Sequence, residues 1–250
     1  MDEHLYDAFF RLERSHWWFV ARQQILLRLT RRFLPPGGKF LDVGCGTGDY
    51  LETASREFDG HGIDCSATAV RICRERGLTN VTATTLEDLT EQPQAQFNAV
   101  MFFDVIEHLD DDTGALAAAR RVLVPGGVVM VTVPAYQFLW SRHDDENQHR
   151  RRYTARQLRA RLKTAGYRVE MLTYFNTLLF PLAVARRTAQ RFFPQPDYDE
   201  LAMPRGWRNA CLRRVFGVEA PFVKRASAYG LFPFGLSIAA VGRFVGGPVK

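Results

Sequence analysis

The sequence predicts an α/β fold in which a doubly wound, mostly parallel sheet is covered by helices on both faces. Two observations carry this prediction. Short apolar runs alternate with helix-like stretches from residue 39 to residue 133, and a glycine-rich loop follows the first run directly. A chain of 250 residues, of which 46% are apolar, is long enough to bury one such domain with an elaboration.

The N-terminal segment precedes the alternating region and is expected to be helical over residues 5–33. Leu26, Leu29 and Phe33 recur at helical spacing, and the stretch Pro35-Pro36-Gly37-Gly38 ends the pattern. Strands are then expected at residues 39–43, 61–64, 81–85, 99–103 and 128–133, and helices between them at 50–57, 67–76 and 113–123.

The part of the chain after Arg152 is expected to add one helix and two strands. Thr154 is a suitable cap for a helix through Ala165, which Gly166 would end. Residues 169–174 and 236–241 read as strands, and the sixty or so residues between them are too many for a plain hairpin connection.

Charge is distributed unevenly along the chain. Residues 1–150 carry 15 Lys and Arg against 22 Asp and Glu, a net charge of −7, whereas residues 151–250 carry 18 against 5, a net charge of +13. A basic half suits a phosphate-bearing partner, which could be nucleic acid, a lipid headgroup or a substrate, or it is ordinary arginine-rich surface. The four cysteines form no CxxC pair, so neither a zinc ribbon nor a disulfide framework is indicated.

The most specific stretch is the glycine-rich loop, Asp42-Val43-Gly44-Cys45-Gly46-Thr47-Gly48. Alternating glycines after a strand let the backbone turn tightly and approach a ligand, and the following helix directs its N-terminal NH groups toward that ligand. Asp64 ends the next strand, where a carboxylate can accept ribose hydroxyl groups. The loop reads GxGxG and not the GxGxxG of dinucleotide-binding proteins, and Asp42 would repel a pyrophosphate while tolerating a cationic ligand.

Here the sequence resembles the class I S-adenosylmethionine (SAM)-dependent methyltransferases, whose signature is an LDVGCGTG loop followed by an acid after the second strand. The resemblance continues through FDVIEHL at residues 103–109 and LVPGG at residues 123–127, and it covers roughly residues 15–135. It implies a Rossmann-like, seven-stranded sheet and SAM as cofactor, with S-adenosylhomocysteine as its product.

The resemblance also implies a division of the chain into four parts: an N-terminal helical cap at residues 1–36, a SAM-binding core at 37–175, a basic, apolar helical insertion at 176–233, and a last strand with the C-terminal tail at 234–250. The insertion is expected either to cap the substrate or to face a membrane. Its apolar run at residues 178–185 is shorter than the roughly twenty residues that a membrane-spanning helix needs.

The cofactor-binding residues follow from the same resemblance. Gly44 and Gly46 are expected to line the methionine moiety, Asp64 to bind the ribose, and Phe103 to lie near the sulfonium. Ser15-His16-Trp17-Trp18 and Arg22 resemble the N-terminal helix of the ubiquinone-pathway O-methyltransferases, in which the matching arginine contacts SAM. The full predicted set is Arg22, Asp42, Gly44, Gly46, Asp64, Cys65, Leu86, Glu87, Phe103 and Asp104.

One departure from the family's pattern affects the adenine contact. Relatives often place an aspartate at the end of the third strand, where this chain has Thr84-Thr85-Leu86. Leu86 or Glu87 is therefore expected to substitute for it.

The catalytic residues are expected in the polar loop after the fifth strand, WSRHDDENQHRRRY at residues 140–153. In an open parallel sheet the reaction takes place at the carboxyl ends of the strands, so this loop overhangs the methyl group. His143 and His149 are the predicted proton acceptors, with His143 preferred because it is nearer the strand. Trp17, Trp18, Trp140, Arg151 and Arg152 are the predicted substrate-binding residues, although the same side chains could serve only as core aromatics or solvated loop charges.

A second interpretation concerns Asp104, Glu107 and His108. Acid, acid and histidine at this spacing resemble the metal ligands of small-RNA 2′-O-methyltransferases, and His143 or His149 could complete such a site. Because EHL is also frequent in metal-free relatives, where it seats the following helix, we expect no metal.

The predicted function is SAM-dependent methyl transfer to a hydrophobic or anionic small-molecule acceptor, at oxygen, with deprotonation by a loop histidine. The alternatives are RNA methylation, which the basic half permits, and a SAM-binding regulatory protein without activity. No DNA partner is expected. The predicted location is the cytoplasm, with contact between residues 176–225 and the inner face of the membrane as an open alternative.

Overall fold

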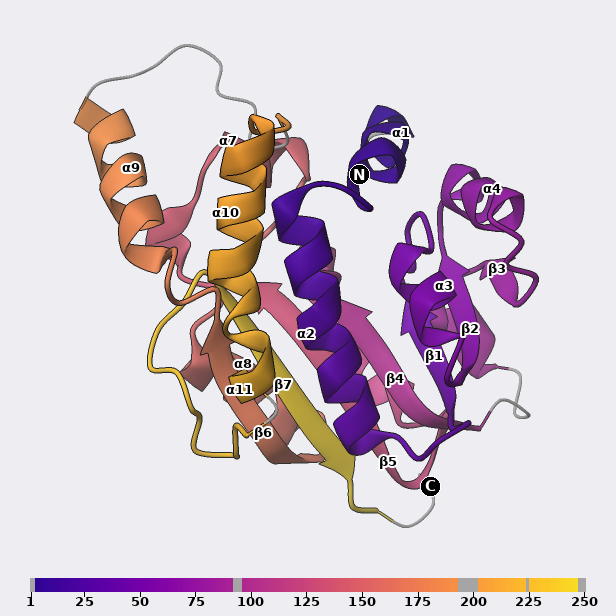
Figure 1. Ribbon diagram of the computed structural model, residues 1–250. Coiled ribbons are helices and arrows are strands. Elements are labelled where there is room, and N and C mark those ends of the chain that lie inside the picture. Colours follow the sequence, from indigo (N-terminus) through magenta and orange to yellow (C-terminus); the bar gives the residue numbers. More distant parts are fainter. Residues whose placement is uncertain (1–2, 92–95, 193–201, 224, 247–250) are drawn as a thin grey trace.

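A seven-stranded sheet forms the centre of the computed structural model, which describes residues 3–91, 96–192, 202–223 and 225–246 (Figure 1). The strand order is β3-β2-β1-β4-β5-β7-β6. The strands are β1 (Lys39–Val43), β2 (Asp59–Asp64), β3 (Val81–Ala83), β4 (Phe97–Phe103), β5 (Leu123–Pro134), β6 (Tyr167–Phe175) and β7 (Ser237–Phe244). Strands β1 to β5 are parallel to one another, and β7 is antiparallel to both β5 and β6. The predicted fold class is confirmed.

Helices cover both faces of this sheet. They are α1 (Glu3–Leu12), α2 (Trp17–Phe33), α3 (Asp49–Ala54), α4 (Ala67–Glu75), α5 (Leu86–Thr90), α6 (Asp112–Ala119), α7 (Arg142–Glu146), α8 (Ala155–Thr164), α9 (Phe180–Phe192), α10 (Gly206–Gly217) and α11 (Ala220–Val223), with short 3-10 turns at Ile106–His108 and Gln137–Leu139. In Figure 1, α2 and α10 lie side by side in front of the sheet, whereas α8 lies behind it.

The core is divided into two layers by the alternation of side chains along the strands. In β4, Ala99 and Met101 pack into the layer beneath α2, α3 and α10, whereas Val100 and Phe102 pack into the layer beneath α6 and α8. All four side chains are fully buried. Strands buried on both faces read as continuous apolar runs, which explains why the sequence pattern identified them.

The predicted N-terminal helix over residues 5–33 is wrong in one respect, because the structure has two helices there. The helix is interrupted at residues 13–16, between α1 and α2. His16 adopts an extended conformation (φ −71°, ψ 133°), and its side chain caps α2 by accepting a hydrogen bond from the Trp18 NH. The break turns α1 away from α2 and over the carboxyl edge of the parallel strands (Figure 1). Spacing alone could not locate this break, since apolar residues continue on both sides of it.

Most other element boundaries differ from the predictions by one to five residues. The helix expected over residues 113–123 ends at Ala119, because Leu123 already pairs with Phe97 as the first residue of β5. The polar loop after β5 contains the short helix α7, which begins with a capping box between Ser141 and Asp144. The helix capped by Thr154 is confirmed, and Gly166 follows it in the left-handed conformation at φ +86°.

The insertion between β6 and β7 is helical, as expected, within the residues that the structure describes; residues 193–201 and 224 of the predicted insertion, and 247–250 of the predicted tail, lie outside them. Phe216 of α10 is fully buried and stacks on Phe175 of β6, so α10 belongs to the core layer. By contrast, the side chains described in α9 are half-buried or exposed. Among the described residues no helix combines the length and hydropathy needed to cross a membrane.

Candidate active site

The glycine loop between β1 and α3 has the backbone that its sequence predicts. Gly44, Gly46 and Gly48 have φ values of +67°, +55° and +80°, a region that side chains with a Cβ rarely adopt. A Cβ at Gly44 would lie 2.9 Å from the side chain of Val105, whereas one at Gly46 would meet nothing within 4 Å. The loop is therefore tightly packed at Gly44 and open at Gly46, where a ligand can approach the backbone.

Asp64 lies at the end of β2, beside this loop. Its two carboxylate oxygens accept hydrogen bonds from the backbone NH groups of Gly46, at 2.9 Å, and Ser66, at 2.8 Å. Each oxygen keeps a second lone pair for a further donor. A fixed carboxylate with two remaining acceptor sites fits the two hydroxyl groups of a ribose, so the loop and Asp64 together suit the predicted cofactor.

Asp42 lies in β1 directly before the loop and is almost fully buried. Burial raises the pKa of its carboxyl group to about 7; the positive charge of Arg22 opposes this shift, and the negative charge of Asp64 adds to it. Asp42 therefore titrates near neutral pH, and a cationic ligand beside it would favour its charged form.

Arg22 of α2 and Asp104, the residue after β4, form an ion pair with an N–O distance of 2.7 Å. Asp104 has a φ of +59°, and its carboxylate also accepts a hydrogen bond from Thr132 of β5 at 3.1 Å. The guanidinium of Arg22 lies over the ring of Trp18, 5.2 Å from its centroid. Two predicted cofactor residues from distant parts of the chain are thus brought together at the carboxyl edge.

The remaining predicted cofactor residues lie around the same edge, and their roles remain predictions. Phe103 packs edge-on against Tyr50 of α3, with ring centroids 4.9 Å apart, and Cys65 is exposed beside Asp64. Leu86 is buried at the start of α5 and Glu87 is exposed next to it.

The N-terminal segment holds the glycine loop through residues that the sequence did not identify. Glu13, which is 4% exposed, accepts a hydrogen bond from the Thr47 hydroxyl and pairs with the buried side chain of Arg76 at the end of α4. Tyr6 of α1 is buried near Asp64, and burial raises the pKa of its hydroxyl group. Nothing in the spacing of these residues indicated their role, because it depends on the break at His16.

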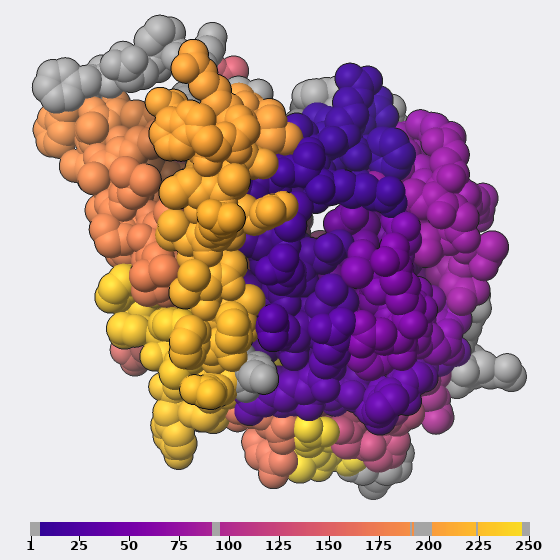
Figure 2. Space-filling view, viewed as in Figure 1, coloured from indigo at the N-terminus to yellow at the C-terminus, as the bar shows by residue number. Residues whose placement is uncertain are grey.

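A cavity of about 260 Å³ lies beside this contact, between the N-terminal segment, α2 and α3. It is lined by residues that include Glu13, Arg14, Gln23, Asp49 and Glu52. Figure 2 shows the surface hollowed beside the N-terminal segment. The cavity adjoins the glycine loop through Asp49, the first residue of α3.

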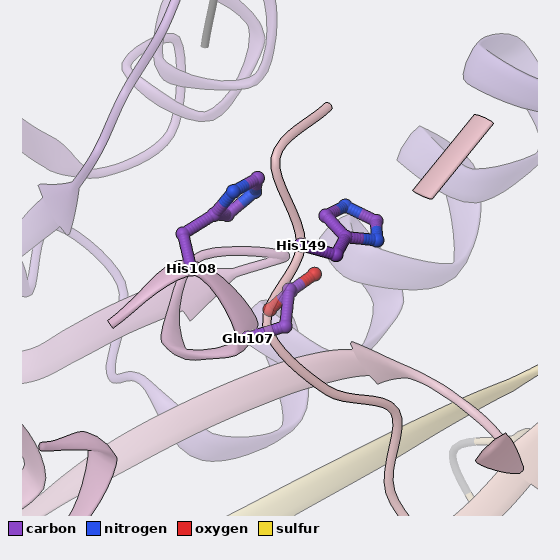
Figure 3. Close-up of side chains that lie close together, drawn as sticks. All are labelled: Glu107, His108 and His149. Carbon is purple, nitrogen blue, oxygen red and sulfur yellow. The ribbon is translucent and has the colours of Figure 1, made fainter. Parts of the chain in front are cut away.

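Three side chains converge beyond the end of β4: Glu107 and His108 from the 3-10 turn, and His149 from the segment after α7 (Figure 3). Their ligand atoms all lie within 4.8 Å of one another, and the two imidazole centroids are 4.7 Å apart. Burial lowers the pKa of His108 to about 4, with His149 contributing in the same direction. Burial raises the pKa of Glu107 well above its usual value, and Asp104 adds to the shift. These are the described residues best arranged to hold a metal ion.

His149 is oriented by Asp144, the buried acid of the α7 capping box, whose Oδ1 lies 2.8 Å from the histidine Nδ1. Asp144 also binds the guanidinium of Arg152 through both oxygens, at 2.7 and 2.9 Å. Although burial opposes ionisation, the hydrogen bonds from His149 and Arg152 hold the pKa of Asp144 well below its usual range. His149 is thus the more rigidly held of the two predicted catalytic histidines.

His143 lies on α7, with its ring centroid 6.3 Å from that of His149. It is half-buried, and the side-chain nitrogen of Asn147 lies 3.2 Å from its Nδ1. The structure therefore places both predicted proton acceptors in one loop, as the sequence indicated.

The predicted substrate-binding arginines have partners within the protein. Arg152 is buried with Asp144, and Arg151 donates to the backbone carbonyl groups of Leu109 and Asp110, at 2.9 and 3.1 Å. These contacts hold the loop to the segment after β4. A direct role of either arginine toward a substrate remains a prediction.

The three predicted substrate-binding tryptophans do not form one wall. The ring of Trp17 packs against Phe216 of α10, with centroids 6.0 Å apart, and Trp18 packs edge-on against Phe19. The indole of Trp140 donates to Asp145 at 2.9 Å, within the polar loop after β5.

An aromatic cluster that the sequence did not single out lies just beyond β5. Tyr136 stacks on Tyr174 of β6, with centroids 5.1 Å apart and planes 9° apart, and also contacts Phe138 and Phe180 at 5.3 and 5.6 Å. Phe234 contacts Phe180 at 5.3 Å. Tyr136 has a φ of +57°, which is uncommon for an aromatic residue and turns the chain at the carboxyl edge. The cluster connects that edge to the first turn of α9.

Comparison with known proteins identifies the family. A family model described as a methyltransferase domain matches residues 18–172, more than half of the chain. The chain is 32% identical over 164 residues to a probable SAM-dependent methyltransferase of Mycolicibacterium smegmatis, covering 64% of this chain and 62% of that protein. It is 35% identical over 129 residues to a ubiquinone biosynthesis O-methyltransferase of Hahella chejuensis, covering 45% of this chain and 54% of that protein.

A third relative is a probable tRNA methyltransferase 9B of Bos taurus, 33% identical over 141 residues, which cover 54% of this chain and 30% of that protein. The chain thus spans about six-tenths or less of the length of these relatives. None of their names mentions a metal.

The fold is shared with solved methyltransferases. A SAM-dependent methyltransferase from Archaeoglobus fulgidus superimposes with a TM-score of 0.57 and 17% identity, covering 88% of this chain and 94% of that one. The glycine loop, Asp64 at the end of β2 and the matched family model all agree with this likeness. The chain therefore belongs to the methyltransferase domain family, whose cofactor is SAM.

Proposed function

We propose that this protein is an enzyme that transfers a methyl group from SAM to an oxygen atom of a hydrophobic or anionic small-molecule acceptor. One observation carries the proposal: the cofactor residues and both loop histidines meet at one edge of the sheet. Asp104 links the predicted cofactor residues to the loop histidines. It pairs with Arg22, and it is followed three and four residues later by Glu107 and His108, which lie beside His149.

The chemistry divides between cofactor and protein. When bound, SAM supplies a methyl group on a sulfonium, which needs little further activation. The protein has to align the acceptor, exclude water and accept the proton that the acceptor loses. The N-terminal segment closes the cofactor side through Glu13 and Thr47, and His143 or His149 of the catalytic loop accepts the proton.

The aromatic cluster supports a hydrophobic acceptor. Tyr136, Tyr174 and Phe180 bring ring surface to the carboxyl edge, next to the strand that leads into the catalytic loop. Oxygen as the accepting atom is supported by the similarity to ubiquinone biosynthesis O-methyltransferases. The segment between β6 and β7, which contributes Phe180 and Phe234, would set specificity.

Calorimetry and a transfer assay test the proposal. We expect S-adenosylhomocysteine to bind and NAD not to bind, because the loop is GxGxG and Asp42 disfavours a pyrophosphate. Asp64→Ala should weaken cofactor binding by about 1.5–3 kcal/mol, the range for hydrogen bonds to charged groups. NAD binding without cofactor binding would refute the assignment.

The acceptor class is tested by methyl transfer from labelled SAM to apolar phenols, to anionic small molecules and to RNA. Incorporation into the first or second class supports the proposal. Incorporation into RNA alone would favour the alternative that the basic half permits, and cofactor binding without any transfer would favour a regulatory protein.

We further propose a cytoplasmic enzyme that contacts an anionic membrane surface through α9 and α10. Leu182, Phe192 and Trp207 are 63%, 74% and 70% exposed on these helices. Exposed arginines, Arg205 and Arg208 among them, lie near Trp207. Apolar side chains beside arginines are typical of helices that lie at the headgroup level of a bilayer.

A further inference from the structure

The carboxylate of Glu107 is buried without the hydrogen bonds that a buried charge requires. The residue is fully buried, and neither of its oxygens has a hydrogen-bond partner among the residues that the structure describes. A carboxyl group in the protein interior without a hydrogen-bond partner is unfavourable. The positive charges of Arg22 and Arg152 favour the ionised form of Glu107, and the imidazoles of His108 and His149 lie beside it.

Although the sequence leads us to expect no metal, we infer from this cluster that Glu107, His108 and His149 bind a divalent transition-metal ion. Their ligand atoms lie within 4.8 Å of one another, and in Figure 3 the Glu107 carboxylate points toward the space between the two rings. The three groups come from two segments, so the ion would join the turn after β4 to the catalytic loop.

The backbone already holds these two segments in register. The NH of Arg150 donates to the carbonyl oxygen of Glu107, and the Arg150 side chain donates to the carbonyl oxygen of His108, both at 2.8 Å. The ligands are therefore positioned by contacts that do not depend on the ion, as a pre-organised site requires.

Each histidine also has the outer hydrogen bond that metal-binding imidazoles usually make. Asp144 occupies Nδ1 of His149, which leaves Nε2 as the nitrogen for the ion, and the carboxylate is itself fixed by Arg152. His108 hydrogen-bonds the backbone of Gln148. Such partners fix the ring orientation and the tautomer and strengthen the ligand.

The donor set indicates the class of ion. Two imidazoles and one carboxylate suit zinc, cobalt, manganese or iron, whereas magnesium and calcium prefer oxygen ligands throughout. Three protein ligands leave coordination positions open. An oxygen of the acceptor could occupy one of them, which is the only part of the inference that rests on the proposed function.

Cobalt titration of the chelator-treated full chain tests the site without an acceptor. We expect saturable binding of one Co²⁺ per chain, with visible absorption bands that Zn²⁺ abolishes by displacement and that excess Mg²⁺ leaves unchanged. Glu107→Gln and His149→Ala should each weaken binding by more than about 100-fold, beyond the roughly 10–100-fold that loss of an outer hydrogen-bond partner causes. His61→Ala, a histidine on β2 paired with Asp59, is the matched control and should bind as the wild type.

Circular dichroism and S-adenosylhomocysteine affinity are measured on the same samples, and His108→Ala replaces any variant that does not fold. Absence of one-to-one binding by the wild type, or equal affinity in the ligand variants and the wild type, would overturn the metal site. A protein that binds the cofactor but no cobalt loses only this inference. One that binds cobalt but no cofactor loses the proposed function instead.

Discussion

At the scale of single residues, Asp42 couples cofactor binding to pH. Burial raises the pKa of its carboxyl group to about 7, so the free protein holds it partly protonated at neutral pH. Because a raised pKa favours the neutral form, this contribution to stability is present at low pH and is lost as pH rises through about 7. A cationic ligand has the opposite preference and favours the carboxylate.

Cofactor binding should therefore release a proton near pH 7, and SAM affinity should rise with pH through about 6 to 8. Calorimetry in two buffers of different ionisation enthalpy measures the number of protons released on binding. Asp42→Asn should abolish the release. If Asp42→Asn releases as many protons as the wild type does, another group is responsible for the release.

The two loop histidines are separated by substitution. His143→Ala should lower kcat by roughly 10²–10⁴ with unchanged cofactor affinity, as expected for loss of a proton acceptor. His149→Ala should lower kcat as well, and in addition abolish cobalt binding. Full activity of His143→Ala would remove it from the proton transfer and leave that role to solvent, or to His149 if that residue binds no metal ion.

At the scale of elements, α1 and the residues after it act as the closure of the cofactor site. Glu13 joins Thr47 of the glycine loop to Arg76 at the end of α4, and Arg76 also lies over the ring of Phe10, 4.5 Å from its centroid. Glu13→Gln should destabilise the protein by about 1.5–3 kcal/mol, because it removes one of the carboxylates that pair with the buried guanidinium and leaves Glu52, at 3.2 Å. The affinity for the cofactor should fall as well, because Glu13 holds the glycine loop through Thr47.

Chemical denaturation and calorimetry measure the two effects. Asp7→Asn removes an exposed carboxylate from α1, the helix just before Glu13, and is the control, with little change expected in either quantity. If Glu13→Gln binds the cofactor as well as the wild type does, the closure serves stability alone.

The same element shows what sequence could and could not predict. The strands were predictable because Val100 and Phe102 belong to continuous apolar runs, and the glycine loop because its backbone excludes a Cβ. The break at His16 was not predictable, since it depends on a local hydrogen bond within a helical pattern. Glu13 and Asp144 were therefore missed as partners: their roles arise from chain segments that meet only after folding.

At the scale of the whole molecule, the basic and apolar face of α9 and α10 predicts salt-dependent binding to vesicles. Co-sedimentation with vesicles containing phosphatidylglycerol should fall steeply as salt is raised, because exposed charges are screened. Arg205→Glu with Arg208→Glu should abolish it. Arg71→Glu with Arg74→Glu, on the exposed surface of α4, is the matched control and should leave it unchanged. Equal binding to neutral vesicles, or none at low salt, would leave the insertion as a substrate cap.

The position of β7 also constrains how the chain is made. Strand β7 lies between β5 and β6 although it is synthesised after both. Strand β6 can therefore join the sheet only when residues 237–244 are available to pair with β5 on one side and β6 on the other. Until then the nascent chain exposes the free edge of β5 and the apolar surface that Phe175 and Phe216 later share. The connection between β6 and β7 must therefore leave the edges of both strands β5 and β6 open for the late insertion of β7. A ribosome that stalls within this connection would hold a chain with an open sheet edge, the form most dependent on chaperones.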